Sequence, residues 1–256
     1  MQIHRFLIEQ DRITAIPEGE RALLFVTAHA LNEINTLNKL LTVAVRYETE
    51  PVWHAHAQAT QALVVARVLL GKLYEMWEAI RAGYFATKLG QTYGRILDPE
   101  SKAALALLKT YFGRKNLVKT VRHGFAFHYS LAEARKPLPR QLPAEELAMY
   151  LHESSSNSLF VFAEVALNSA LLDGISPGEP EAAFEQIFTE TSNVVDLLST
   201  FGRGIVYAIL MKHIGADELV QQRLLIDIGE PPAFDTVKIP FYLGPKSQKP
   251  PSSSAK

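Results

Sequence analysis

One short stretch of the chain, Leu117–Ser130, gathers the side chains best suited to chemistry on a phosphate. It reads LVKTVRHGFAFHYS and holds Arg122, His123 and His128 beside three aromatic residues. Arginine presents a fixed fork of donors that matches phosphate oxygens, and histidine can move a proton near neutral pH. Together they can cleave RNA without a metal. The base takes the proton of the ribose 2′-hydroxyl, that oxygen attacks the adjacent phosphate, and the guanidinium stabilises the developing charge.

The spacing of Arg122 and His128 limits how they can act together. Six residues along an ideal α-helix correspond to about 600° of rotation, which leaves the two side chains about 120° apart. They therefore do not share a face of one straight helix. Gly124 could relax the geometry, the pair could lie at a helix end, or a second subunit could complete the site.

Basic residues surround this stretch. Nine Lys or Arg residues and a single acid, Glu133, lie between Ser101 and Arg140, although the net charge of the whole chain is −1. A phosphate-bearing ligand would meet a positive surface here, with Lys115 and Lys119 as the candidate phosphate contacts. The alternative is a solvated helix face with no ligand.

Composition sets the broad class of protein. The chain has 256 residues, is 48% hydrophobic and 21% charged, and contains no cysteine. The absence of cysteine excludes disulfides, zinc–thiolate sites and thiol catalysis. The N-terminus lacks the apolar region of a secretory signal, and the longest apolar run, Leu159–Leu172, is too short to span a bilayer. We therefore expect a cytoplasmic protein with no membrane partner.

Apolar residues that recur at spacings of three and four predict amphipathic helices. We expect long helices over residues 18–46, 56–83, 99–111 and 181–213, a continuation at 117–121, and shorter helices at 144–152 and 159–173. Three glycines between residues 83 and 94 predict a loop. Gly202 and Gly204 are expected to weaken or bend the last long helix, and residues 224–228 to be extended.

The fold class that follows is all-α, an antiparallel helical bundle with additional C-terminal helices. We expect an N-terminal arm over residues 1–17, the bundle over 18–136, a helical extension packed on the bundle within the same domain over 137–244, and a disordered tail over 245–256. The tail is rich in Lys, Pro and Ser, which is typical of disorder.

The segment VRHGFAFHY, in this helical setting, resembles the Arg-polar-x-His signature of the HEPN superfamily. Five residues separate Arg122 from His128, and His123 occupies the polar position after the arginine. The similarity covers roughly residues 20–135, with two long helices before the motif and a third leading into it. We recognise no relative of residues 144–256.

The resemblance implies a helical bundle that dimerises and brings two motifs into one cleft. It implies a metal-independent endoribonuclease, of the toxin or anti-phage defence type, with Arg122 and His128 as the catalytic pair and His123 and Tyr129 as auxiliary groups. RNA, a second copy of the chain and an antitoxin or defence-system protein would be its partners. Other members of the superfamily have lost catalysis, so the alternative is a non-catalytic module that dimerises and binds a nucleotide or a partner protein.

Several other residues carry competing interpretations. His54 and His56 could both bind a metal in an extended segment, but no third ligand is identifiable and polar turn residues explain them better. Glu33 and Glu75 lie within the first two long helices, where a single acid could pair with Arg122 or His128 across the bundle. Solvent-facing placement is the commoner fate of such residues, and only Glu33 is noted as a possible supporting group. The aromatics could stack on bases, although Phe125 and Phe127 fit a core role better. No glycine-rich phosphate loop, nucleophile elbow or zinc-protease helix occurs, so we expect neither a cofactor nor a metal.

Overall fold

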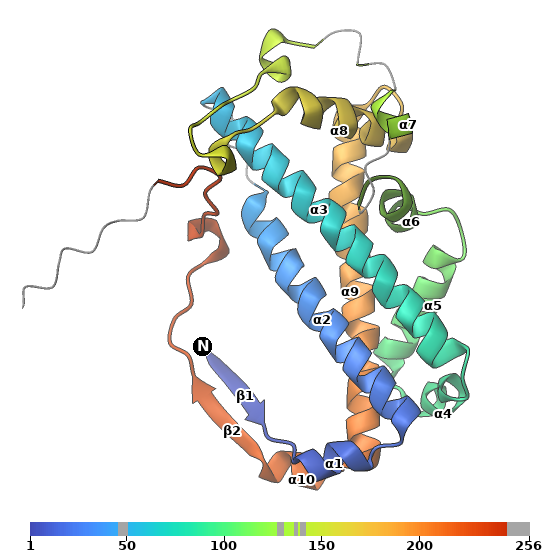
Figure 1. Ribbon diagram of the computed structural model, residues 1–256. Helices are drawn as coiled ribbons and strands as arrows, with labels where there is room; N and C mark the ends of the chain where they lie inside the picture. The colour runs from blue at the N-terminus through green and yellow to red at the C-terminus, as the bar shows by residue number, and fades with distance from the viewer. Residues whose placement is uncertain (46–50, 127–130, 136–137, 139–141, 245–256) are drawn as a thin grey trace, which may run out of the picture.

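Helices form most of the structure, which is a computed structural model that describes residues 1–45, 51–126, 131–135, 138 and 142–244. The predicted all-α fold is confirmed (Figure 1). The helices are α1 (Gln10–Ala15), α2 (Glu18–Ala44), α3 (Val52–Ile80), α4 (Leu89–Ile96), α5 (Pro99–Phe112), α6 (Leu117–Val121), α7 (Leu131–Ala134), α8 (Val161–Ile175), α9 (Pro180–His213) and α10 (Ala216–Gln221). Two π-helical turns, η1 (Arg81–Phe85) and η2 (Arg122–Ala126), extend α3 and α6.

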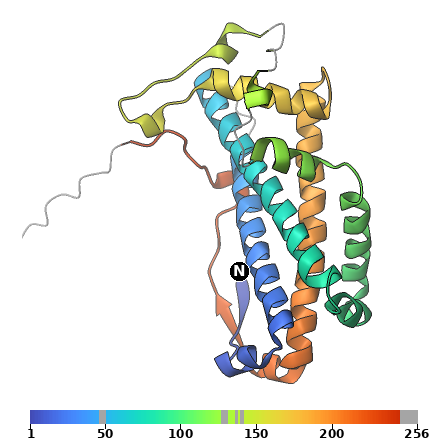
Figure 2. The ribbon, with the colours of Figure 1, turned by 45° about the vertical axis from the view of Figure 1, so that its right-hand side comes forward.

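The antiparallel pair α2 and α3 forms one side of the bundle (Figures 1 and 2). Each helix begins directly after a proline, Pro17 or Pro51, which fixes an extended backbone before the first turn. The helices bury the leucine and isoleucine stripes that the sequence predicts, including Ile34 and Leu73, which have no exposed surface. The second helix begins at Val52, four residues earlier than expected.

Helix α9 lies in the middle of the molecule and contacts α2, α3 and α5 (Figure 2). Leu198, Phe201 and Ile205 on α9 are fully buried. By length and composition α9 could cross a bilayer, although in the structure its apolar residues contribute to the core. The segment expected to pack onto the outside of the bundle thus supplies one of its central helices.

Gly202 and Gly204, expected to weaken or bend the last long helix, do not interrupt it, because α9 runs as one helix from Pro180 to His213. The glycines instead allow close helix packing. A Cβ on Gly204 would lie 2.0 Å from Ser101 Oγ on α5, and one on Gly202 would lie 2.8 Å from Met76 Cε on α3. At both positions the neighbouring helix lies too close to leave room for a side chain.

The predicted loop after Gly83 is also wrong, because η1 and α4 occupy most of it. Gly90 has an ordinary helical backbone, but a Cβ there would lie 2.8 Å from the Tyr84 carbonyl oxygen. Close packing between η1 and α4 explains this glycine better than a turn does. The helix buries Tyr93 completely.

The expected helix over residues 144–152 is reduced to a 3₁₀ turn, η3 (Ala144–Leu147). The chain then becomes extended, since Tyr150 exchanges two backbone hydrogen bonds of 2.7 Å with Leu159. A second 3₁₀ turn, η4 (Ser155–Asn157), lies between them, and α8 follows as predicted. A last 3₁₀ turn, η5 (Phe234–Thr236), precedes the C-terminal region, whose expected tail over 245–256 lies outside the described residues.

The N-terminal arm is ordered by partners at the other end of the sequence. Strand β1 (Gln2–Phe6) pairs antiparallel with β2 (Arg223–Asp227), which includes 224–227 of the predicted extended segment 224–228. Arg12 on α1 forms an ion pair with Glu218 on α10, and Ile16 is buried. The arm is thus joined to the C-terminal part of the chain.

A buried carboxylate connects three helices at this end of the bundle. Glu20 at the start of α2 accepts hydrogen bonds from the Tyr93 hydroxyl and from Lys212 Nζ at 2.8 and 3.0 Å, and lies 2.5 Å from His213 Nε2. Burial alone raises the pKa of Glu20, but these hydrogen bonds outweigh it and lower the pKa to about 2. Glu20 is therefore ionised at neutral pH.

Candidate functional site

Arg122 is the first residue of the π-helical turn η2, directly after the short helix α6. Asn116 caps α6, because its side-chain oxygen accepts the Lys119 N–H at 2.9 Å. Arg122 Nε donates to Glu75 Oε1 on α3 at 3.0 Å, and its guanidinium lies 5.9 Å from the centre of the Tyr74 ring. The Arg122 side chain is 25% exposed and that of Glu75 51%, so the ion pair lies at the surface.

The π-helical turn changes the geometry that a straight helix would impose on this stretch. A π-helix takes more residues per turn than an α-helix, so each residue rotates the chain by less, and such turns occur often at functional sites. A Cβ on Gly124 would meet no atom within 4 Å, so this glycine is not required by packing. His128 and Tyr129 lie outside the described residues.

Three of the predicted residues line one surface hollow, which we name the α5–α6 groove. It has a volume of about 510 Å³. Its lining comes from the end of α5, the connection to α6, α6 itself and η2: Phe112, Gly113, Arg114, Lys115, Asn116, Lys119, Thr120 and His123. The predicted phosphate contacts Lys115 and Lys119 and the predicted auxiliary residue His123 are thus brought together.

The cations of the α5–α6 groove are available to a ligand. Arg114, Lys115 and Lys119 are exposed, and among the residues that the structure describes none of them forms an ion pair. His123 is also exposed, and its ring lies edge-on to Tyr74 with the ring centres 5.4 Å apart. Tyr74 therefore contacts both Arg122 and His123 and holds the two side chains beside each other.

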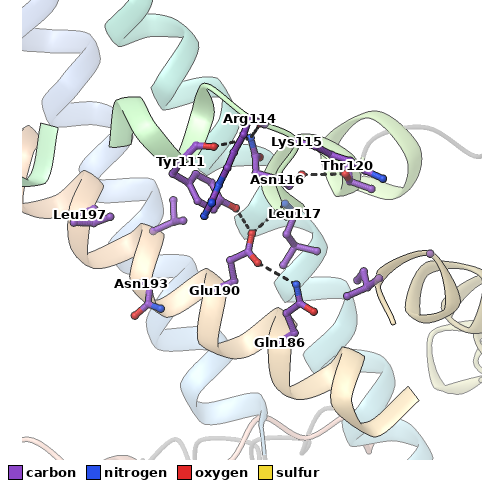
Figure 3. A pocket seen from close by; sticks show the side chains of 13 residues that line it. Tyr111, Arg114, Lys115, Asn116, Leu117, Thr120, Gln186, Glu190, Asn193 and Leu197 are labelled. Carbon is purple, nitrogen blue, oxygen red and sulfur yellow. Dashed lines mark hydrogen bonds between the residues drawn. The ribbon is translucent and has the colours of Figure 1, made fainter. Parts of the chain in front are cut away.

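A second hollow adjoins the groove, with a volume of about 530 Å³ (Figure 3). Arg114, Lys115, Asn116 and Thr120 line both hollows, so the two adjoin at the α5–α6 connection. The far wall comes from α9, where Gln186, Glu190 and Asn193 are found. We name this hollow the Glu190 pocket.

Glu190, on α9, anchors the start of α6. Its Oε1 accepts the Tyr111 hydroxyl and the Leu117 N–H, the latter at 3.0 Å, and its Oε2 accepts Gln186 Nε2 at 3.3 Å (Figure 3). Burial and the hydrogen bond to Glu190 raise the pKa of Tyr111 above its usual range. The carboxylate thus binds to protein donors, and the adjoining groove keeps its positive character.

Glu33 does not reach the site, because it forms an ion pair with Lys72 at 2.6 Å. The acid that pairs with Arg122 is instead Glu75, so the preference for Glu33 as the supporting group is wrong. Phe125 packs against the core as expected, whereas Phe127 lies outside the described residues.

His54 and His56 lie on α3 rather than in an extended segment. Two residues apart on a helix, they do not share a face. His56 Nδ1 lies 3.1 Å from the Tyr150 hydroxyl, and His54 Nε2 lies 3.4 Å from Gln58 Nε2. Among the described residues, no three His, Asp or Glu side chains are grouped to hold a metal ion.

Tyr74, Tyr111 and Glu190 belong to this region but are not apparent from the sequence. Tyr111 and Glu190 are 79 positions apart and share no motif. Tyr74 directly precedes Glu75, but consecutive residues on a helix point about 100° apart, so this adjacency does not predict a shared surface.

Comparison of the chain with protein-family models, with curated proteins and with solved structures returned no match.

Proposed function

We propose that this chain is a HEPN-like helical protein that binds RNA along the α5–α6 groove and cleaves the strand without a metal ion. The observation that carries the proposal is the clustering of Arg114, Lys115 and Lys119, none ion-paired among the described residues, beside His123 in the groove. Arg122 does not line the groove, but it contacts Tyr74 as His123 does. Cations that have no acidic partner can exchange their counterions for phosphates, which is the main source of affinity for nucleic acids.

The shape of the groove favours a single strand over a small phosphate ligand. Its cations lie on the α5–α6 connection and on α6, and the Glu190 pocket adjoins the groove at Arg114 and Lys115. A flexible strand can follow such a track, with lysines on successive phosphates. The chain as a whole is close to neutral, so the attraction is local to this surface.

In the proposed reaction, His128 removes the proton of a ribose 2′-hydroxyl. The 2′-oxygen attacks the neighbouring phosphorus, and the bond to the 5′-oxygen of the next nucleotide breaks. Arg122 stabilises the charge that builds up on the phosphate oxygens, and the leaving 5′-oxygen takes a proton from solvent water. The products are a 2′,3′-cyclic phosphate and a 5′-hydroxyl end.

The ion pair with Glu75 supports a second candidate function. An arginine held by a carboxylate is less available to a phosphate, and a non-catalytic module that binds a nucleotide or a partner protein would keep Arg122 in such a pair. The two candidates differ in whether RNA is cut. A cytoplasmic location and an antitoxin or defence-system partner belong to the first candidate and depend on it.

Cleavage in the presence of a chelator tests the proposal. Labelled single-stranded and structured RNAs are incubated with the full chain in EDTA, beside Arg122→Ala, His128→Ala and the control Arg12→Ala, whose ion pair with Glu218 joins α1 to α10 away from the groove (Figure 1). We expect the first two variants to lose cleavage and the control to keep it. Equal cleavage by all four proteins would point to a contaminant. Binding without cleavage by the wild type would favour the second candidate.

A further inference from the structure

The two-stranded ribbon β1–β2 stands apart from the helices (Figures 1 and 2). All of its residues are exposed except Ile226, which is partly covered. Apolar side chains are among them, with Ile3 at 42%, Leu224 at 48% and Leu225 at 48% exposure. An isolated two-stranded sheet is only marginally stable in water, and three or more strands are needed for a stable sheet. The ribbon is therefore suited to pairing with further strands.

The hydrogen-bond pattern tells which residues of β2 face outward. The Ile228 N–H donates to the Met1 carbonyl at 3.1 Å, and the register continues with Gln2 opposite Asp227. Hydrogen-bonded and non-hydrogen-bonded pairs alternate in an antiparallel ladder. The backbone groups of Arg223, Leu225 and Asp227 therefore point away from β1. No other strand among the described residues pairs with this outer edge.

The sequence of β2 is complementary to itself when read in the opposite direction. The strand reads Arg-Leu-Leu-Ile-Asp from 223 to 227. An antiparallel copy centred on Leu225 sets Arg223 opposite Asp227 at both ends, and opposite charges directly across a sheet stabilise it. The centre falls on a residue whose N–H and C=O face outward, as such pairing requires. Strand β1 lacks this property, since a copy centred on His4 would set Ile3 opposite Arg5 and His4 opposite itself.

We infer that β2 pairs with β2 of a second copy of this chain and forms a continuous four-stranded sheet, β1-β2-β2-β1. The two-fold axis passes between the two Leu225 residues, so the same surface serves both copies. On one face, Leu224 of each copy then lies opposite Ile226 of the other, next to Ile3. This extends the apolar surface across the new sheet and covers part of what the single ribbon exposes.

This dimer differs from the one that the family resemblance implies. The ribbon lies on the α2 side of the bundle, whereas α6 lies on the other side of α3 (Figure 1). A sheet formed through β2 therefore leaves the two α5–α6 grooves away from the interface, each built within one chain. The inference does not depend on RNA cleavage, and its test needs no RNA.

Charge reversal tests the pairing directly. Arg223→Asp alone and Asp227→Arg alone each set like charges opposite each other twice per dimer. We expect each to raise the dimer dissociation constant at least about tenfold in sedimentation velocity. An equimolar mixture of the two variants restores both attractive pairs, so it should dimerise like the wild type. Arg223 also contacts His4 within its own chain, and Arg223→Asp removes this contact. Mixing the two variants does not repair the contact, so recovery of the dimer in the mixture reports on pairing between chains.

A disulfide test locates the axis. The chain has no cysteine, so Leu225→Cys introduces a single one. Cα atoms of a directly opposed hydrogen-bonded pair lie about 5.5 Å apart, which is within disulfide range. We expect mild oxidation to yield a covalent dimer of Leu225→Cys. The control Ile3→Cys is similarly exposed but lies on β1, away from the two-fold axis, so it should not form one. A monomeric wild type, or a dimer that fails both the mixing and the disulfide tests, would overturn the inference.

Discussion

Arg122 and Glu75 are 47 residues apart in the sequence, yet Arg122 Nε donates to Glu75 Oε1 at 3.0 Å across the surface between η2 and α3. The pair holds the first residue of the motif against the bundle while leaving it partly exposed. A phosphate that contacts this guanidinium must either share the guanidinium with Glu75 or displace the Glu75 carboxylate from it. The carboxylate therefore both orients Arg122 and competes with a ligand.

Neutralising Glu75 tests this competition. In Glu75→Gln the amide keeps the size of the side chain but loses its charge, so a phosphate meets less competition at Arg122. We expect RNA binding to tighten by about two- to fivefold, the range that an exposed ion pair accounts for. The matched control is Glu218→Gln, which removes the partner of Arg12 between α1 and α10. Weaker binding by Glu75→Gln would mean that orientation of Arg122 matters more than competition.

Removing Glu190 tests the anchor of α6. Glu190→Ala leaves the Tyr111 hydroxyl and the Leu117 N–H without their acceptor, and unsatisfied buried donors cost about 1–3 kcal/mol each. We expect the free energy of unfolding, measured in urea, to fall by at least about 1 kcal/mol. Glu185→Ala, an exposed acid on the same helix, should change it by less than about 0.5 kcal/mol. Equal effects of the two substitutions would argue against the anchoring role.

The buried Glu20 predicts how stability changes in acid. Its pKa is about 2 in the folded protein against an ordinary value of 4.5. Its contribution to stability is therefore fully present above pH 4.5 and is lost as the pH falls toward 2. At pH 7 it amounts to about 3 kcal/mol. We expect Glu20→Gln to destabilise the fold at pH 7 and to lose much less stability than the wild type between pH 5 and pH 2.5. Parallel pH profiles of unfolding free energy in the two proteins would contradict this.

Close packing between α5 and α9 makes Gly204 intolerant of a side chain. A methyl group there would lie 2.0 Å from Ser101 Oγ, on a residue that is itself buried. We expect Gly204→Ala to lower the free energy of unfolding by about 1–3 kcal/mol. Gly174→Ala on α8 meets no atom within 4 Å and should raise it by up to about 1 kcal/mol. Thermal denaturation of both variants checks the contrast in sign.

The elements that were predicted well are those whose signal lies within the element itself. The long helices α2, α5 and α9 follow from apolar spacing, and the nearness of Lys115, Lys119, His123 and Arg122 follows from their places on one short stretch. Glycine was the main source of error, because the sequence does not tell a turn from a close contact. Gly90 and Gly204 both belong to close contacts.

What could not be predicted depends on partners far away in the sequence. Strand β1 is a strand only because Arg223–Asp227 lies beside it. Helix α9 reads as an amphipathic helix, but nothing local says that it lies at the centre of the bundle. The Tyr111–Glu190 contact carries no motif. In the site, the sequence favoured Glu33 as the supporting acid, whereas the structure pairs Arg122 with Glu75, and the competition of Glu75 with a ligand follows only from the observed distance and exposure.

The salt dependence of RNA binding tests the central claim most directly. Fluorescence anisotropy with a short single-stranded RNA, at several salt concentrations in EDTA, compares the wild type with Lys115→Ala/Lys119→Ala and with the control Lys39→Ala on the exposed side of α2. If both lysines contact phosphates, the slope of log K against log salt falls in magnitude by about 1.4, or about 0.7 for each contact. The control should keep the wild-type slope. An unchanged slope in the double variant would contradict the assignment of the α5–α6 groove as the RNA-binding site.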